Sequence, residues 1–289
     1  MARRAVITAG TGGIGLETAL GLTKAGYAVT VIGRNAERGA RAVERINTGG
    51  EEPAQFLQAD LASLDEVRTL AEQIAAEGEV DVLVNNVGAM FPDHTELGGV
   101  EASFVVNHLS PYLLTELLLP RLHRVVNVTS GSVMVAKKVF DEVEPPGGYY
   151  GFHWYGRAKL ANLAYTLDLA QRTKASGVAV FAADPGGAAT DMTDGTMRTP
   201  KIVSPGLRLL WPLVRRTFER ATSGPASAAA RPSIIAATDQ TLPTGTVIGR
   251  RGAPVTPIRA ATDPRVTEAV RRLSERHAPL VQVPDGISN

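Results

Sequence analysis

Residues 6–34 read VITAGTGGIGLETALGLTKAGYAVTVIGR, a stretch that predicts a strand, a glycine-rich turn, a helix and a second strand. Residues 5–8 are apolar and β-branched, which is typical of a short buried parallel strand. Four glycines then fall between residues 10 and 15, where they allow a backbone to approach a pyrophosphate closely. The helix that follows points its positive N-terminus at such an anion. Because the turn lies between a strand and a helix, we interpret it as a dinucleotide-binding turn and not as an ordinary glycine turn.

The composition limits the functions that the chain can have. The chain has 289 residues, is 44% hydrophobic, carries a net charge of +1 and contains no cysteine. A nearly neutral chain gives no indication of a nucleic-acid partner, and the lack of cysteine excludes disulfides and thiol catalysis. No apolar run approaches the ~20 residues that a membrane-spanning helix needs. We therefore expect no membrane span and a cytoplasmic protein.

The rest of the chain alternates between strand and helix patterns. Strands are expected at residues 5–8, 27–32, 54–59, 81–85, 124–129, 178–182 and 246–249. Helices are expected at residues 37–47, 64–74, 100–119, 155–174, 226–237 and 266–273. The alternation predicts an α/β protein with a doubly wound parallel sheet, a Rossmann fold of about seven strands in the order 3-2-1-4-5-6-7. No linker or repeat interrupts the chain before residue 190, so we expect residues 1–289 to form a single domain.

Polar and glycine residues follow the points where the predicted strands end. The residues at these positions are Gly10, Arg34, Asp60, Asn86, Ser130 and Pro185. Ligands of parallel sheets bind beyond the carboxyl ends of the strands. We therefore expect these residues to converge on one edge of the sheet, around a ligand.

Tyr155 and Lys159 form a pair that indicates acid–base chemistry. They stand four residues apart on a predicted helix, so both side chains lie on one face. A free tyrosine has a pKa of about 10 and is a poor acid at neutral pH. A nearby ammonium stabilises the phenolate, so we expect Lys159 to lower the pKa of Tyr155 towards the range of a general acid–base catalyst.

At this point the chain resembles the short-chain dehydrogenase/reductase family, and the resemblance runs nearly from end to end. Residues 8–15 are similar to the family's Thr-Gly-x-x-x-Gly-x-Gly turn, and residues 85–88 are similar to Asn-Asn-Ala-Gly. The family's catalytic tetrad is matched by Asn107, Ser130, Tyr155 and Lys159. Residues 104–109, residues 159–162 and a long insert between Ser130 and Tyr155 are typical of the retinol-dehydrogenase-like branch.

The resemblance implies a mechanism. NADPH would deliver hydride to a carbonyl carbon, Tyr155 would protonate the oxygen, and Ser130 would hydrogen-bond that oxygen. Lys159 would also hold the nicotinamide ribose, and Asn107 would hold a water that links Lys159 to solvent. The cofactor-binding residues implied in this way are Gly10, Thr11, Gly13, Ile14, Gly15, Arg34, Asn35, Asp60, Leu61, Asn86, Gly88, Tyr155, Lys159, Pro185, Gly186, Ala188 and Thr190.

Ala9 departs from the family pattern, because it replaces the first glycine of the turn. Alanine is tolerated there only at a negative φ. We therefore expect a negative φ at Ala9 and a loop that lies slightly differently.

Arg34 decides the choice of cofactor. An NAD enzyme places an acidic residue at the end of the second strand, where it binds the ribose 2′-hydroxyl. This chain instead has Gly33-Arg34-Asn35, with no acid before Glu37. A guanidinium pairs well with a 2′-phosphate, so we expect NADP(H).

The expected substrate pocket is apolar and aromatic, with few fixed charges. Its walls are expected to come from Met90, Phe91, Val133, Met134, His153, Trp154, Met192 and a substrate-covering loop and lid helix at residues 191–222. This lining favours a bulky hydrophobic ketone or aldehyde, of the steroid, retinoid, terpenoid or polyketide kind. The five histidines have no metal-ligand spacing, so no metal site is expected.

The lid helix has a second interpretation. Apolar residues between 207 and 218 form a stripe that is surrounded by arginines. We favour a lid that packs on its own domain, and the alternative is a basic amphipathic face that lies on a membrane surface.

Two other functions remain open: an alcohol dehydrogenase that works in the oxidative direction, and a non-catalytic NADP-binding sensor or scaffold on the same fold. For the assembly, we expect a homodimer through the helices at 100–119 and 155–174, with a monomer as the alternative.

Overall fold

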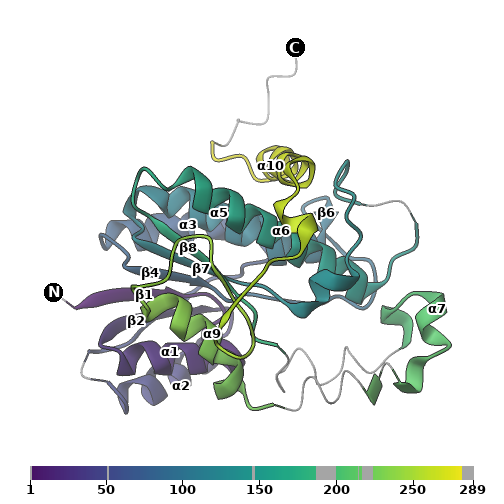
Figure 1. The fold of residues 1–289 in the computed structure, drawn as a ribbon. Coiled ribbons are helices and arrows are strands. Elements are labelled where there is room, and N and C mark those ends of the chain that lie inside the picture. The colour runs from purple at the N-terminus through teal and green to yellow at the C-terminus, as the bar shows by residue number, and fades with distance from the viewer. Residues whose placement is uncertain are drawn as a thin grey trace.

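The computed structural model describes residues 2–50, 52–144, 147–186, 200–213, 215–216 and 224–281. Its centre is an eight-stranded sheet in the order β10-β9-β8-β7-β4-β1-β2-β3 (Figure 1). The pairing is parallel throughout except between β9 and β10. The strands of this sheet are β1 (Arg3–Ile7), β2 (Tyr27–Gly33), β3 (Gln55–Gln58), β4 (Val82–Asn85), β7 (Arg124–Val128), β8 (Ala179–Ala183), β9 (Val247–Ile248) and β10 (Pro254–Val255).

Helices cover both faces of the sheet (Figure 1). One face carries α3 (Leu64–Ala76), α5 (Ser110–Leu118), α6 (Gly151–Arg172) and α10 (Pro264–His277). The other face carries α1 (Gly13–Lys24), α2 (Ala36–Asn47) and α9 (Ala226–Thr238). The short helix α7 (Pro205–Arg208) lies outside these layers, at the right edge of Figure 1. Among the described residues, no helix combines the length and the apolar composition that crossing a bilayer requires.

The central strands are apolar on both sides because a hydrophobic core lies on each face of the sheet. In β1, Val6 packs into the core beneath α3, α5 and α6, whereas Ala5 and Ile7 pack into the core beneath α1 and α9. The same alternation holds in β8, where Val180 and Phe181 face opposite cores. This period of two residues is the side-chain geometry of a strand. Burial on both faces explains why these strands read as continuous apolar runs.

The predicted strand order is confirmed, with β1, β2, β3, β4, β7, β8 and β9 as the seven expected strands. The strand count differs by one, because residues 254–255 add β10 antiparallel to β9. Two residues with no apolar alternation around them carry no strand signal that can be read from the sequence.

The helix predicted at residues 100–119 is wrong at its start. Residues Val100–Glu101 form β6, which pairs antiparallel with β5 (Glu96–Leu97). The chain then passes through α4 (Ala102–Phe104) and a π-helical turn at Val105–Leu109 before α5 begins. Within the turn, Asn107 Nδ2 donates to the carbonyl of Ser103 at 2.9 Å. A side-chain amide on that carbonyl competes with the ordinary helical hydrogen bond, which favours the wider turn.

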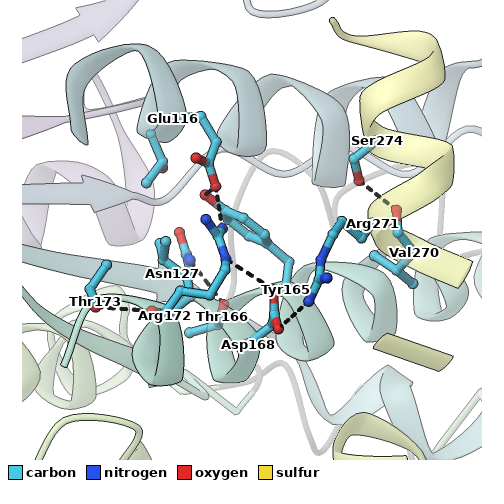
Figure 2. Close-up of polar contacts among 12 residues, drawn as sticks. Glu116, Asn127, Tyr165, Thr166, Asp168, Arg172, Thr173, Val270, Arg271 and Ser274 are labelled. Atoms are coloured by element: carbon cyan, nitrogen blue, oxygen red, sulfur yellow. Dashed lines mark hydrogen bonds and ion pairs between the residues drawn. The ribbon is translucent and has the colours of Figure 1, made fainter. Parts of the chain in front are cut away.

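A charged pair fastens the helix α10 to α6, and further charged contacts join α6 to α5 (Figure 2). Asp168 of α6 accepts from Arg271 of α10 at 2.7 Å and from Arg172 at 3.1 Å. Arg172 also pairs with Glu116 of α5, which accepts from Tyr165 Oη at 3.1 Å. The outer side of α6 is therefore packed against a helix of the same chain.

His108 links the π-helical turn to α10. Its Nε2 lies 2.7 Å from Ser274 Oγ, and Ser274 Oγ donates to the carbonyl of Val270. The other ring nitrogen, Nδ1, is fully buried and has no hydrogen-bond partner. Burial, assisted by the positive charge of Arg157, lowers the pKa of His108 from 6.5 to about 3.

We predict that His108 makes the fold sensitive to acid. Between pH 6.5 and about 3 the unfolded chain binds a proton that the folded chain does not, so stability falls as the pH falls. The expected loss reaches about 1.4 kcal/mol per pH unit within this window. Urea unfolding of wild type and His108→Gln at pH 7 and pH 4.5 measures it, and the variant should lose less stability. Equal losses in both proteins would contradict the prediction, and the exposed His123→Gln serves as the control.

Candidate active site

A cavity of about 940 Å³ lies at the carboxyl ends of the central strands and at the N-terminus of α1. It is lined by most of the residues that the sequence indicated. These are Thr11, Gly13, Ile14, Gly15, Arg34, Asn35, Asp60, Leu61, Asn86, Gly88, Ser130, Tyr155, Lys159, Pro185 and Gly186. Residues from β1, β2, β4, β7 and β8 thus meet at one edge of the sheet, as parallel strands allow.

Four of the predicted catalytic and cofactor-binding residues are not in this lining, and of the predicted wall residues, Met90, Val133, Met134, His153, Trp154 and Met192 are not in it either. Gly10 lies beneath the turn, where a Cβ would come within 2.7 Å of Val31 Cγ1, so a side chain at this position would clash with β2. Asn107 is completely buried behind the cavity. Ala188 and Thr190 lie outside the described residues, as does half of the loop and lid helix predicted at 191–222, including the expected wall residue Met192.

The glycine turn is held by a close backbone approach. A Cβ at Gly15 would come within 2.3 Å of the carbonyl oxygen of Ala9, so only glycine fits there. Asn86 Nδ2 donates to this carbonyl at 3.3 Å and to the carbonyl of Thr8 at 3.1 Å. The Thr8 hydroxyl in turn accepts from the amides of Asn86 and Val87. The turn and the end of β4 therefore form one hydrogen-bonded unit.

The expectation of a negative φ at Ala9 is wrong. Ala9 has a φ of 50°, and no other non-glycine residue of the described chain has a positive φ. The left-handed region costs alanine roughly 1–2 kcal/mol. The bond from Asn86 and the neighbouring amide of Gly10, which donates to Ile32 O at 3.0 Å, offset this cost by holding the backbone in place. The turn keeps the conformation that a glycine would adopt.

The first turn of α1 faces the cavity without a side-chain cap. Gly12, the N-cap residue, makes no side-chain hydrogen bond to the helix, and Gly12, Gly13 and Ile14 line the cavity. Unsatisfied amides at a helix N-terminus and the positive end of the helix dipole favour an anion. The turn therefore fits a pyrophosphate.

A buried polar chain fastens α6 to the sheet. Asn85 of β4 donates to Asn127 of β7 and to Thr115 of α5, each at 2.8 Å. Asn127 then donates to Thr166 of α6 at 2.9 Å, a contact that Figure 2 shows. Thr166 donates to the carbonyl of Asn162. These bonds set the position of the helix that carries Tyr155 and Lys159.

Tyr155 lies at the apolar end of the cavity. It is buried and packs with Met90, Ile202 and Val203. Burial raises the pKa of Tyr155 to about 12, a hydrogen bond with Ser130 lowers it in part, and the charge of Asp184 raises it. The pKa of Tyr155 is therefore raised, whereas its spacing to Lys159 led us to expect a lowered pKa. The reason is that the loss of solvation outweighs the other effects.

Lys159 is buried one turn further along α6. Its Nζ donates to the carbonyl of Val87 at 3.1 Å and to that of Val128 at 3.0 Å. A Cβ at Gly88 would lie 3.5 Å from this Nζ and 3.4 Å from Asn107 Oδ1, so Lys159, Gly88 and Asn107 meet here. Burial without a carboxylate partner lowers the pKa of Lys159 to about 7.

Arg157 connects the catalytic helix to the insert, residues 131–150. Its guanidinium is buried and donates to the carbonyls of Val139, Glu142 and Val143. The ring of Phe140 lies 4.3 Å from the guanidinium carbon. Arg157 thus orders the insert from the opposite side of the helix to Tyr155.

Two arginines line the far end of the cavity, beyond the glycine turn. Arg34 follows β2 as predicted, and Arg38 lies one turn into α2. A Cβ at Gly12 would come within 2.8 Å of Arg38 Nη2, so this guanidinium lies over the turn. Sequence reasoning missed Arg38, although its position four residues after Arg34 on a predicted helix was a usable signal.

Other residues of the cavity were missed as well. Phe152 lines it three residues before Tyr155, which places both on one helix face. Arg250, whose stem would lie 3.1 Å from a Cβ at Gly186, follows β9 and has no sequence motif. The prediction that Met134 forms part of the pocket wall is wrong, because its side chain is 68% exposed on the surface.

Comparison with known proteins gives a consistent picture. The family described as short chain dehydrogenase matches residues 3–201. Mouse retinol dehydrogenase 12 is 34% identical over 227 residues, covering 76% of this chain and 69% of that protein. Human retinol dehydrogenase 13 is 36% identical over 65% of this chain and 59% of that protein. Bovine dehydrogenase/reductase SDR family member 13 is 36% identical over 64% of this chain and 51% of that protein. The chain thus spans between 51% and 69% of the length of these relatives.

Solved structures with the same fold are also known. A crystal structure of an uncharacterized protein from Mycobacterium paratuberculosis is 29% identical, covers 95% of this chain and 92% of its own, and has a TM-score of 0.75. The RhlG/NADP active-site complex of Pseudomonas aeruginosa is 26% identical, covers 87% of this chain and 95% of its own, and has a TM-score of 0.66.

We predict that Lys159 lowers the stability of the fold near neutral pH. Its pKa falls from 10.5 in the unfolded chain to about 7, so between these values the unfolded chain binds the additional proton. Wild-type stability should therefore rise with pH, by up to about 1.4 kcal/mol per unit, relative to Lys159→Met. Urea unfolding at pH 7 and pH 9.5 measures this difference. A difference that does not change with pH would refute it, and the exposed Lys24→Met is the matched control.

Proposed function

We propose, on the premise that this chain belongs to the short-chain dehydrogenase/reductase family and its retinol-dehydrogenase-like branch, that it reduces a carbonyl group on a bulky hydrophobic substrate with NADPH. The family makes it an oxidoreductase. The observation that carries the proposal is the position of Tyr155, a buried phenol bonded to Ser130, between an apolar pocket and the glycine turn.

The cavity fits NADPH. The uncapped start of α1 and the close approach at Gly15 suit a pyrophosphate. Arg34 and Arg38 would hold a 2′-phosphate, and no acidic residue at the end of β2 competes for a 2′-hydroxyl. Asp60 and Leu61 would border the adenine, and Lys159 would hold the nicotinamide ribose. The RhlG protein, which has the same fold, forms its active-site complex with NADP, and this likeness supports the same choice.

The cofactor supplies the hydride, and the residues of the chain supply the proton and the orientation. Tyr155 donates its phenolic proton to the carbonyl oxygen as the new C–H bond forms, and Ser130 hydrogen-bonds the same oxygen. Lys159, one turn further along α6, is the group from which the Tyr155 phenolate regains its proton. Asn107 holds the backbone of Ala89 through both polar atoms of its side chain, Oδ1 and Nδ2. This contact keeps the surroundings of Lys159 in place.

The protonation of Tyr155 favours reduction over oxidation. A proton donor must carry its proton, and a pKa of about 12 keeps Tyr155 protonated at every physiological pH. The oxidative direction needs the phenolate, whose population falls about tenfold for each unit by which the pH lies below the pKa. We therefore propose reduction as the working direction near neutral pH.

The walls near Tyr155 favour a lipophilic substrate. Met90, Ile202 and Val203 are buried there, and Phe152, Leu207 and Trp211 pack against them. A ketone or aldehyde of the steroid, retinoid, terpenoid or polyketide kind would bury its apolar body on these side chains. The names of the retinol dehydrogenases among the relatives agree with such a substrate.

A non-catalytic NADP sensor is the rival function. It would bind the cofactor through the same turn and would have no use for an acid. The complete set of Asn107, Ser130, Tyr155 and Lys159 weighs against it.

We predict that Tyr155→Phe abolishes turnover and leaves NADPH binding intact. Loss of a general acid should reduce kcat by about 10²–10⁴-fold. NADPH oxidation with a panel of hydrophobic ketones and aldehydes measures kcat, and fluorescence titration measures NADPH binding. Tyr150→Phe, which removes a hydroxyl just before α6, is the control. NADPH binding without turnover of any panel member by wild type would favour the sensor instead.

We predict that Arg34→Glu changes the cofactor preference. Replacing a charged hydrogen bond to the 2′-phosphate with a repulsion should raise the KM for NADPH roughly 10- to 100-fold and leave that for NADH little changed. Steady-state kinetics with both cofactors test this. Arg41→Glu reverses a charge on α2 outside the cavity lining and should have no such effect. An unchanged KM for NADPH in Arg34→Glu would show that Arg34 does not read the phosphate.

A further inference from the structure

The segment that covers Tyr155 is apolar on both of its faces. Ile202 and Val203 are buried, and Leu207 and Trp211 pack towards Tyr155. On the opposite face, Leu209 is 86% exposed, Leu210 is 56% exposed and Leu213 is 65% exposed. A lid that met only water would carry polar residues on that outer face. We call residues 200–213 and 215–216 the lid segment.

The insert carries a second group of exposed apolar residues. Met134 is 68% exposed, Val135 is 39% exposed and Val139 is 47% exposed. Within the part of the chain that the structure describes, nine large hydrophobic side chains are exposed, and six of them lie on the insert or the lid segment. Such a concentration marks an interaction site, whereas single exposed apolar residues are ordinary.

The two segments are neighbours in space. His153 of α6 lies between them: its Nδ1 is 3.0 Å from the carbonyl of Val135, and its Nε2 accepts from the amide of Ser204 at 3.4 Å. The Arg208 guanidinium lies 5.6 Å from the ring of Tyr150. In Figure 1, α7 lies at the same end of the molecule as the start of α6. We call the exposed residues of both segments together the lid–insert surface.

The charge around this surface is mainly positive, and it comes from the lid segment. The lid segment contains four basic residues, which are Lys201, Arg208, Arg215 and Arg216, and no acidic residue. The insert adds two lysines, Lys137 and Lys138, and three acidic residues, Asp141, Glu142 and Glu144. The whole chain has a net charge of only +1, so this concentration of positive charge is local.

We propose that the lid–insert surface docks on the surface of an anionic lipid bilayer. Apolar side chains that enter the headgroup region, with cations around them, are what an interfacial anchor requires. A second copy of the chain suits the surface less well. In a two-fold dimer the same patch meets itself, which would bring the four cations of one lid segment against the four of the other.

Docking would place the entrance of the pocket against the membrane. The inner face of the lid segment packs towards Tyr155, and its outer face would touch the lipid. A lipophilic substrate would then move from the bilayer into the pocket without crossing water. This consequence rests on the proposed function, whereas the docking itself does not.

Co-sedimentation with large vesicles tests the docking. The full chain is mixed with vesicles of phosphatidylcholine alone, or with about 30% phosphatidylglycerol, at low and high salt. We expect binding to the anionic vesicles that falls roughly tenfold when salt shortens the range of electrostatic attraction. The double variant Leu209→Glu/Leu210→Glu should bind at least about tenfold more weakly, because it removes apolar contact and adds repulsion.

The matched control is Val255→Glu/Val281→Glu, which changes two exposed apolar residues outside the surface and should bind as wild type does. Equal binding by the two double variants, equal binding with and without the anionic lipid, or no binding would each overturn the proposal. Sedimentation velocity adds a further check. If wild type is a dimer and the variant Leu209→Glu/Leu210→Glu is a monomer, the surface binds a second copy of the chain and not a membrane. Vesicle binding needs no substrate, so its failure is distinguishable from a failure of the reductase assay.

Discussion

The buried chain of amides and hydroxyls from Asn85 through Asn127 to Thr166 is the interaction on which the candidate active site depends. It joins β4, β7 and α6 inside a core that consists mainly of apolar side chains. A buried amide that loses its partner costs about 1–3 kcal/mol, so the chain accepts one register between helix and sheet. Tyr155 and Lys159 stand on that helix, and Ser130 follows that strand. Their relative positions are therefore set by a polar network inside the core.

Most of the sheet could be predicted from the sequence, because each central strand is a short apolar run followed by a polar or glycine residue. The edge of the sheet that holds the site follows from the same pattern. The π-helical turn at Val105–Leu109 could not be predicted, since its cause is a side-chain bond from Asn107 to Ser103. Arg250 reaches the cavity only through the tertiary position of β9. Such placements depend on packing, which spacing along the chain does not encode.

For Tyr155 and Lys159, too, the sequence predicts one property and not another. Their spacing correctly indicates one helix face. Their pKa values depend instead on how much water the folded chain removes, and burial moves both groups towards their neutral forms. The site holds a protonated phenol beside an amine that is close to its own midpoint at neutral pH. The cost of burying that amine falls on the stability of the fold, as is common where residues are kept for chemistry.

Ala9 has a consequence for how such turns are recognised in other chains. Its backbone keeps the left-handed conformation because Asn86, 77 residues later, holds its carbonyl. A signature that demands glycine at this position would pass over the chain, although the shape that glycine provides is intact. The better marker is a pair of positions, the turn residue and the asparagine that bonds to it. In a chain where the turn residue is not glycine, the asparagine should be the less replaceable of the two residues.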